Sequence, residues 1–199
     1  MSRLEAALTT LLNDLTREGT RAALVGGLAV SARTEPRFTR DLDLAVAVAG
    51  DAEAERLVQA LVASGYGTVA LVEQEKTHRL ATVRLSLPGE NTRGVVADLL
   101  FASSGIEPAV VAEAEPLAVF PRLMVPVARV GHLIALKLLS RDDPSRPQDA
   151  LDLRALFRVV TEPELARAAQ AVQQIEDGGF ARGRDLRAAL AQWSREGKG

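Results

Sequence analysis

Asp41 and Asp43, two aspartates one residue apart, have types and spacing that could do chemistry. They open the segment DLDLAVAV, whose alternation of large apolar residues with small or acidic ones predicts a strand over residues 41–48. Residues i and i+2 of a strand point to the same face, so the two carboxylates lie close together and repel. A divalent cation removes this repulsion, and an all-oxygen ligand set favours Mg²⁺. The pair therefore indicates a magnesium site, although many such motifs elsewhere bind nothing.

A third carboxylate, Asp98, stands within the apolar segment VVADLLF, which predicts a strand over residues 95–101. An aspartate among apolar neighbours is costly to bury without a partner. It is therefore either a hydrogen-bonded core residue or a further metal ligand. Three carboxylates from two strands could hold two Mg²⁺ ions about 4 Å apart, an arrangement that serves phosphoryl and nucleotidyl transfer.

The pair Gly26-Gly27 follows a short predicted strand over residues 22–25 and precedes a predicted short helix over residues 28–33. Glycine lets the backbone approach a ligand closely, and the free N–H groups at a helix start bind phosphate. The same pair is also consistent with a tight turn and no ligand.

Composition sets limits on the function. The chain has 199 residues, of which 47% are hydrophobic and 25% charged, as in ordinary globular domains. The net charge of −2 gives no general attraction to nucleic acid, so such binding needs a local basic patch. The absence of cysteine excludes disulfides, thiolate metal sites and cysteine nucleophiles. With no apolar run near the roughly 18 residues of a membrane span and no signal-peptide pattern, we expect a cytoplasmic protein without membrane partners.

Other elements must position the three carboxylates. Ser2 and Glu5 predict a capping box that starts a helix, and Gly19 predicts its end. Hydrophobic periodicity predicts a helix over residues 52–63 and a strand over residues 80–87, which a turn containing Pro88, Gly89 and Asn91 joins to the strand at 95–101. We expect the stretch after Phe101 to be irregular apart from a short helix near 108–114.

From residue 130 onward the pattern predicts helices only, over residues 130–140, 147–160, 162–176 and 181–195. The fold class is therefore α/β (α+β), a mixed sheet with flanking helices followed by a helical bundle. We expect an α/β domain over residues 1–125 and a helical domain over residues 126–199 packed on it.

The segment GGLAVSARTEPRFTRDLD resembles the first motif of the AbiEii/AbiGii-type nucleotidyltransferases, a family of the polymerase-β-like nucleotidyltransferase superfamily. That motif is a Gly-Gly or Gly-Ser turn followed by Arg-x-Ser/Thr-x-Asp-x-Asp. ADLLF is similar to the strand that carries the family's third carboxylate. Residues 133–156 are similar to its helical motif, in which a lysine precedes Arg-x-x-Asp-x-x-Asp-Leu, here Lys137, Arg146, Asp149 and Asp152. Leu28 is a departure, because members often carry a phosphate-binding Ser or Thr there, and Ser31 does not obviously replace that hydroxyl.

The resemblance implies a nucleotidyltransferase fold and a role for each matched residue. Asp41, Asp43 and Asp98 would bind the metal ions, and Asp98 would also act on the incoming hydroxyl as a base. Gly26 and Gly27 would cradle the triphosphate, which Lys137 would neutralise. Asp149 and Asp152 either form plain helix salt bridges with Arg146 or Arg154, or orient Lys137 and the substrate. The remaining nucleotide-binding candidates are Arg37, Thr39 and Arg40, of which the two arginines are either phosphate contacts or solvated loop charges.

The interpretation is an enzyme that transfers NMP from an NTP to an acceptor hydroxyl, with Mg²⁺ as cofactor and release of pyrophosphate. The resemblance implies a toxin of a toxin–antitoxin or phage-defence system, with tRNA or another RNA as acceptor and a cognate antitoxin as partner. One alternative acceptor is a small molecule such as an aminoglycoside antibiotic. An acidic pocket in the helical half would favour that cation and a basic one RNA, to which Arg141, Arg146, Arg154 and Arg158 lean. The other alternative is a catalytically silent binding module, supported by Leu28 alone.

Overall fold

A computed structural model describes residues 2–74, 79–89, 94–141 and 147–196, so His78, Asn91 and Arg146 lie outside the described residues. The strands are β1 (Ala22–Val25), β2 (Leu42–Val46), β3 (Gly67–Glu73), β4 (Leu80–Ser86), β5 (Val96–Leu100), β6 (Glu115–Phe120) and β7 (Leu123–Val127). The helices are α1 (Arg3–Arg17), α2 (Gly26–Arg33), α3 (Asp51–Ala63), α4 (Glu107–Ala112), α5 (Val130–Ser140), α6 (Pro147–Val159), α7 (Glu162–Asp177) and α8 (Leu186–Glu196).

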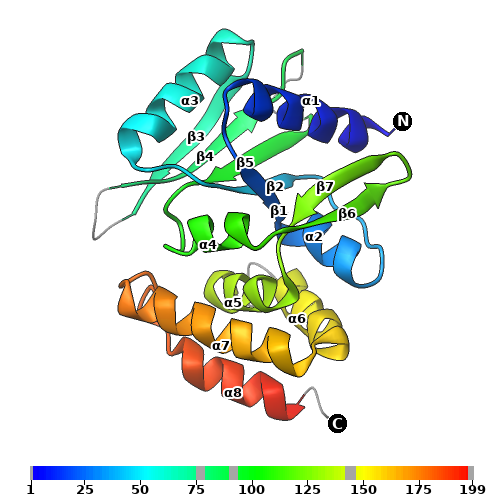
Figure 1. Cartoon of the computed structure of the whole chain (residues 1–199), viewed down its shortest axis with the longest axis vertical. Helices are drawn as coiled ribbons and strands as arrows, with labels where there is room; N and C mark the ends of the chain where they lie inside the picture. The colour runs from blue at the N-terminus through cyan, green and yellow to red at the C-terminus, as the bar shows by residue number, and fades with distance from the viewer. Residues whose placement is uncertain (1, 75–78, 90–93, 142–146, 197–199) are drawn as a thin grey trace.

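The strands form one mixed sheet in the order β3-β4-β5-β2-β1-β7-β6. The strands β2 and β5 run parallel at its centre, and β2 pairs antiparallel with β1. Figure 1 shows α1 and α3 on one face of the sheet and α4 on the other, with the layer of α5 to α8 beyond it. The predicted mixed α/β fold followed by helices is confirmed.

The first helix forms as its sequence predicts. Ser2 accepts a hydrogen bond from the Glu5 amide at 3.1 Å, and the Glu5 side chain accepts one from the Ser2 amide, which completes the capping box. Leu8, Leu11 and Leu15 follow helical spacing and are buried against the sheet. Gly19 then adopts a φ of +69°, the left-handed conformation that follows many helix ends.

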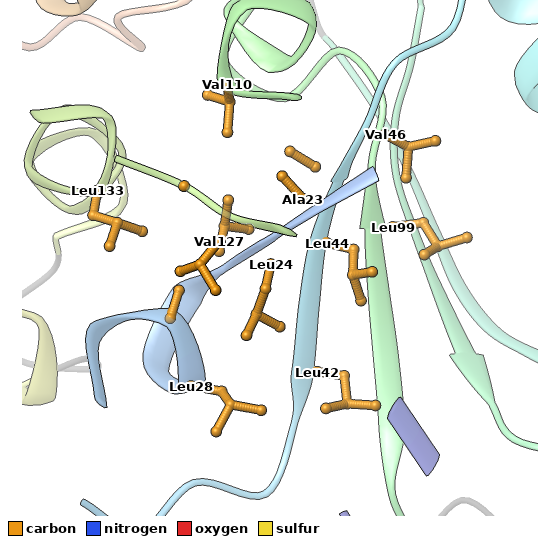
Figure 2. Packing of buried hydrophobic residues seen from close by; sticks show 14 of the residues in the cluster. Ala23, Leu24, Leu28, Leu42, Leu44, Val46, Leu99, Val110, Val127 and Leu133 are labelled. Carbon is orange, nitrogen blue, oxygen red and sulfur yellow. The ribbon is translucent and has the colours of Figure 1, made fainter. Parts of the chain in front are cut away.

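A continuous apolar core joins the sheet to the helices. Leu42, Leu44 and Val46 alternate along β2 and are buried on one face. Figure 2 shows these residues together with Leu24 of β1 and Leu99 of β5. The opposite face of β2 carries Asp43, and this face is turned toward the helical layer.

An ion-pair network links the helical layer to the α/β portion. Arg129, at the start of α5, donates to Glu164 of α7 at 2.7 Å and also to Glu115 of β6. Burial by itself raises the pKa of Glu164, but hydrogen bonds from the Gly131 amide and from Arg129 outweigh burial and lower it. These contacts hold α5, which carries Lys137, against the sheet.

Three strands differ from the predicted elements. β3 is an edge strand whose residues are mostly exposed, so it lacks the alternation that would have revealed it. The hairpin of β6 and β7 places Pro116 opposite Pro126, and proline argues against a strand when only the sequence is considered. As a result the predicted domain boundary at residue 125 falls inside β7, and the helical portion begins at Val130. None of the helices in the described ranges is long and apolar enough to cross a bilayer.

Candidate active site

A cleft of about 1240 Å³ lies between the sheet and the helical layer. Its lining comes from β2, β4 and β5, from the start of α2, from α5, and from the turn between α7 and α8. Every predicted site residue except Asp152 lines it, namely Gly26, Gly27, Arg37, Thr39, Arg40, Asp41, Asp43, Asp98, Lys137 and Asp149. The chain thus brings together in one cavity residues separated by more than a hundred positions.

Strand pairing places the acidic residues side by side. β2 and β5 are parallel neighbours in which Asp43 lies directly opposite Asp98, so both side chains project from the same face of the sheet. Asp41 immediately precedes β2 and lines the same cleft. The two segments that carry the carboxylates, far apart in sequence, therefore meet as the sequence predicts.

The glycine turn fits against this carboxylate cluster. Gly26 is the first residue of α2, which begins two residues earlier than predicted, and its φ is +64°. A Cβ atom at Gly26 would lie 1.9 Å from Oδ2 of Asp43, and one at Gly27 would lie 2.5 Å from Nη2 of Arg37. Any larger residue would displace the side chains of Asp43 and Arg37. Both glycines are therefore required for the close approach of this turn to the cluster.

The third carboxylate is held by an arginine that the sequence analysis did not single out. Arg84 of β4 lies opposite Asp98 of β5 and donates from Nε to Oδ1 at 2.8 Å and from Nη2 to Oδ2 at 2.6 Å. Hydrogen bonds to Asp98 raise the pKa of Arg84 above its ordinary value. The strand alternation could have revealed this residue, because Arg84 is the charged residue between buried Val83 and Leu85.

The donor set fits a divalent cation at the cluster in part. The carboxylates of Asp41 and Asp43 are hard oxygen donors of the kind that Mg²⁺ prefers, and Gly26 leaves room beside Asp43. In contrast, both oxygens of Asp98 are engaged by Arg84. Within the described ranges, no group of three or more His, Asp or Glu side chains is arranged to hold a metal ion. Asp98 as a metal ligand stays a prediction.

Lys137 leaves the apolar surroundings of α5 and reaches two carboxylates of α6. Its Nζ lies 2.6 Å from Oδ1 of Asp149 and 2.8 Å from Oδ2 of Asp152. Ser140 donates to the other oxygen of Asp149 at 2.9 Å. Of the two alternatives for these aspartates, the structure shows contact with Lys137, so they orient its ammonium group at the cleft.

Asp152 connects the helical layer to the loop that leads into β2. Its side chain is only 1% exposed and receives both a two-point hydrogen bond from Arg37, at 2.7 Å for each oxygen, and the ion pair from Lys137. Arg37 is therefore neither a solvated loop charge nor a bare phosphate contact in this structure. It anchors the loop that carries Thr39, Arg40 and Asp41.

Leu28 and His132 belong to the interior. Leu28 is a buried core residue of α2 and is absent from the cleft lining (Figure 2). Ser31 does not supply the missing hydroxyl to the cleft, because it donates to the Gly27 carbonyl at 3.1 Å and accepts from the Arg37 amide at 3.3 Å. His132 is buried in α5, where burial lowers its pKa, and it does not line the cleft.

Two arginines of the helical layer line the cleft, and they differ from those expected. Arg182 and Arg184 lie in the turn between α7 and α8, whereas Arg141, Arg154 and Arg158 are not part of the lining. Arg182 donates to the Ser103 side chain at 3.0 Å, and Arg184 donates to the Arg141 carbonyl. The sequence offered no signal for them, because their closeness to the cluster depends on how the helical layer packs.

Solved structures share the fold at low sequence identity. An antigenic nucleotidyltransferase-like protein from Paracoccidioides brasiliensis superposes with a TM-score of 0.56 at 19% identity, covering 95% of this chain and 92% of that one. The lincosamide antibiotic adenylyltransferase LnuA gives a TM-score of 0.47 at 15% identity, covering 78% and 98%. A putative nucleotidyltransferase from H. pylori gives 0.45 at 15% identity, covering 98% and 91%. The curated proteins contain no match to this chain.

The family assignment rests on a match over nearly the whole chain. The model of the family described as nucleotidyl transferase AbiEii toxin, type IV toxin–antitoxin system, matches residues 10–196. That span includes the glycine turn, the carboxylate cluster and the helical motif with Lys137. The chain therefore belongs to the AbiEii nucleotidyltransferase family and is a nucleotidyltransferase enzyme.

Proposed function

We propose that this enzyme transfers NMP from an NTP to a hydroxyl of RNA, with tRNA as the acceptor, and that it requires Mg²⁺. The observation that carries the proposal is the placement of Asp41, Asp43 and Asp98 beside the glycine turn in a single cleft whose helical wall is basic. A bound Mg²⁺ would neutralise the triphosphate and stabilise the charge that develops on its oxygens.

The residues of the cleft divide the work of the reaction. Asp41 and Asp43 would hold the cation, while Gly26 and Gly27 give the triphosphate close access to the backbone. Lys137, oriented by Asp149 and Asp152, would add a compact positive charge for the phosphates. Asp98 would accept the proton of the acceptor hydroxyl as its oxygen attacks the α-phosphorus. The bond to pyrophosphate breaks as the new phosphodiester bond forms, and pyrophosphate leaves with the electron pair.

The charge of the helical wall favours RNA over a cationic antibiotic. Among the described residues of the helical layer that line the cleft, Lys137, Arg182 and Arg184 are cations and Asp149 is the carboxylate. Lys137 and Asp149 pair with each other, so the wall is basic on balance. A basic wall attracts a phosphate backbone and repels an aminoglycoside. The alternative of a silent module loses its support, because Leu28 lies in the core and not at the phosphate site.

The family also suggests the biological role. Members are described as toxins of type IV toxin–antitoxin systems. We propose that modification of tRNA by this enzyme arrests growth, in a toxin–antitoxin or phage-defence setting, and that a cognate antitoxin protein counters it.

The direct test is incubation of the enzyme with Mg²⁺, each α-labelled NTP in turn and total cellular RNA. We expect label from a preferred NTP to enter RNA of tRNA size and to be released by digestion of the RNA. A parallel reaction with aminoglycosides and lincosamides replaces the RNA. Label that enters the antibiotic and no RNA would contradict the proposed acceptor, and no transfer to any acceptor would contradict the enzyme activity itself.

An exposed aromatic residue beside the cleft gives a second prediction. Phe38 is 77% exposed, and the guanidinium of Arg40 lies 5.4 Å from its ring centre. Unpaired bases stack on such aromatic and guanidinium surfaces, at roughly 1–3 kcal/mol per base. We expect Phe38→Ala to raise KM for RNA about tenfold with little change in kcat or in KM for NTP, measured by steady-state label transfer. Met124→Ala, which removes another exposed side chain away from the cleft, should leave all three values unchanged.

A further inference from the structure

Arg84 occupies a place in the cleft where a positive charge is needed. It lies on β4 in register with Asp98 on the neighbouring strand, and its guanidinium engages both oxygens of that carboxylate. This two-point geometry is the strongest form of arginine–carboxylate pairing. Because both partners stand on paired strands of the sheet, the contact is built into the fold.

The guanidinium also faces the rest of the carboxylate cluster. Nη2 of Arg84 lies 3.8 Å from Oδ2 of Asp41. The fields of Asp98, Asp41 and Asp43 all stabilise the charged guanidinium, after the larger effect of the hydrogen bonds to Asp98. One arginine thus supplies part of the countercharge that three carboxylates on one face require.

The same guanidinium can leave the cluster without disturbing the core. The side chain of Arg84 is 39% exposed and extends along the open cleft, so a change of rotamer moves its charge into solvent. Asp98, by contrast, is fixed within β5 between buried neighbours. A cation that binds Asp98 therefore has to displace Arg84, and Asp98 itself does not need to move.

We propose that Arg84 is a resident cation of the carboxylate cluster that competes with a second divalent cation for Asp98. The inference rests on the proposed function, since it concerns the cation site of that reaction. In the free enzyme a first divalent cation binds at Asp41 and Asp43, and the second position stays closed while Arg84 holds Asp98. The apparent affinity of the second cation is lowered by the cost of displacing Arg84.

Binding of Mn²⁺ to the free enzyme, without NTP, tests this proposal. Electron paramagnetic resonance of unbound Mn²⁺ gives the number of bound ions and their affinities. We expect the wild type to bind one Mn²⁺ per chain, and Arg84→Met to bind a second ion at least about tenfold more tightly than the wild type does. Adding Asp98→Asn to Arg84→Met should remove the second ion and leave the first.

The matched control is Arg79→Met. Arg79 stands just before β4, is also 39% exposed and pairs with an aspartate, Asp51, but it does not line the cleft. This variant should bind Mn²⁺ as the wild type does. If Arg84→Met does not fold, Arg84→Lys serves instead, because a lysine cannot engage both oxygens and should raise the second affinity about threefold.

The proposal is overturned if the Arg84 variants bind Mn²⁺ with unchanged number and affinity, if they lose Mn²⁺, or if the wild type already binds two ions equally tightly. Failure of the proposed function gives a different pattern. In that case NMP transfer is absent in the wild type, while the difference in Mn²⁺ binding between wild type and Arg84→Met persists.

Discussion

Replacing Asp41 and Asp43 together by alanine is expected to lower NMP transfer by at least about 10³-fold, because cation-assisted stabilisation of the transition state contributes several kcal/mol. Both side chains line the cleft, and Asp43 lies beside Asp98 in the register of β2 and β5. Removing them also removes a repulsion between like charges, so the fold should survive. The loss should therefore appear in kcat and in Mn²⁺ binding with the melting temperature unchanged.

The measurement is label transfer from an α-labelled NTP, with circular dichroism to confirm folding. Asp51→Ala is the matched control, since Asp51 is a partly exposed, arginine-paired aspartate outside the cleft lining, and it should retain full activity. Expression of the wild type should arrest growth, and expression of the double variant should not. Arrest that persists in the double variant would separate toxicity from nucleotidyl transfer and would contradict the proposed role.

Asp152→Ala is expected to lower the free energy of unfolding by about 3 kcal/mol, the lower end of the range for a buried ion pair that loses one partner. The Asp152 carboxylate is 1% exposed and accepts from Arg37 at 2.7 Å and from Lys137 at 2.8 Å. Its removal leaves the partly buried Arg37 guanidinium without its carboxylate. For a chain of 199 residues, this corresponds to a fall in melting temperature of about 6–12 °C.

The same substitution should also reduce activity in the folded enzyme, because Arg37 anchors the loop that carries Thr39, Arg40 and Asp41. Denaturant unfolding and label transfer at low temperature separate the two effects. Asp152→Asn keeps the size of the side chain and one acceptor oxygen, and should lie between wild type and alanine. Asp51→Ala breaks a half-exposed pair and should cost less than about 1 kcal/mol. Equal stabilities for Asp152→Ala and Asp51→Ala would show that the buried connection does not stabilise the fold.

Local patterns in the sequence were sufficient for much of the fold and for the acidic part of the site. The capping box of α1, the alternation in β2 and the helical periodicity from Val130 onward each depend on residues a few positions apart. Asp41 and Asp43 share a face because a strand repeats every two residues, whichever strand lies beside it. The edge strand β3 and the proline-containing hairpin of β6 and β7 escaped prediction, because their pairing depends on neighbours and not on their own pattern.

The sequence by itself determined which residues could bind a cation and a triphosphate, since residue type and short-range spacing decide what a strand or turn can present. Only the tertiary structure decided which charges meet. The register of β4 with β5 brings Arg84 onto Asp98, and the packing of α5 and α6 brings Lys137 to Asp149 and Asp152. The placement of Arg182 and Arg184 at the cleft likewise follows from the packing of the helical layer. Electrostatic pairing acts through distance in space, and distance in space is not written in the local pattern of the chain.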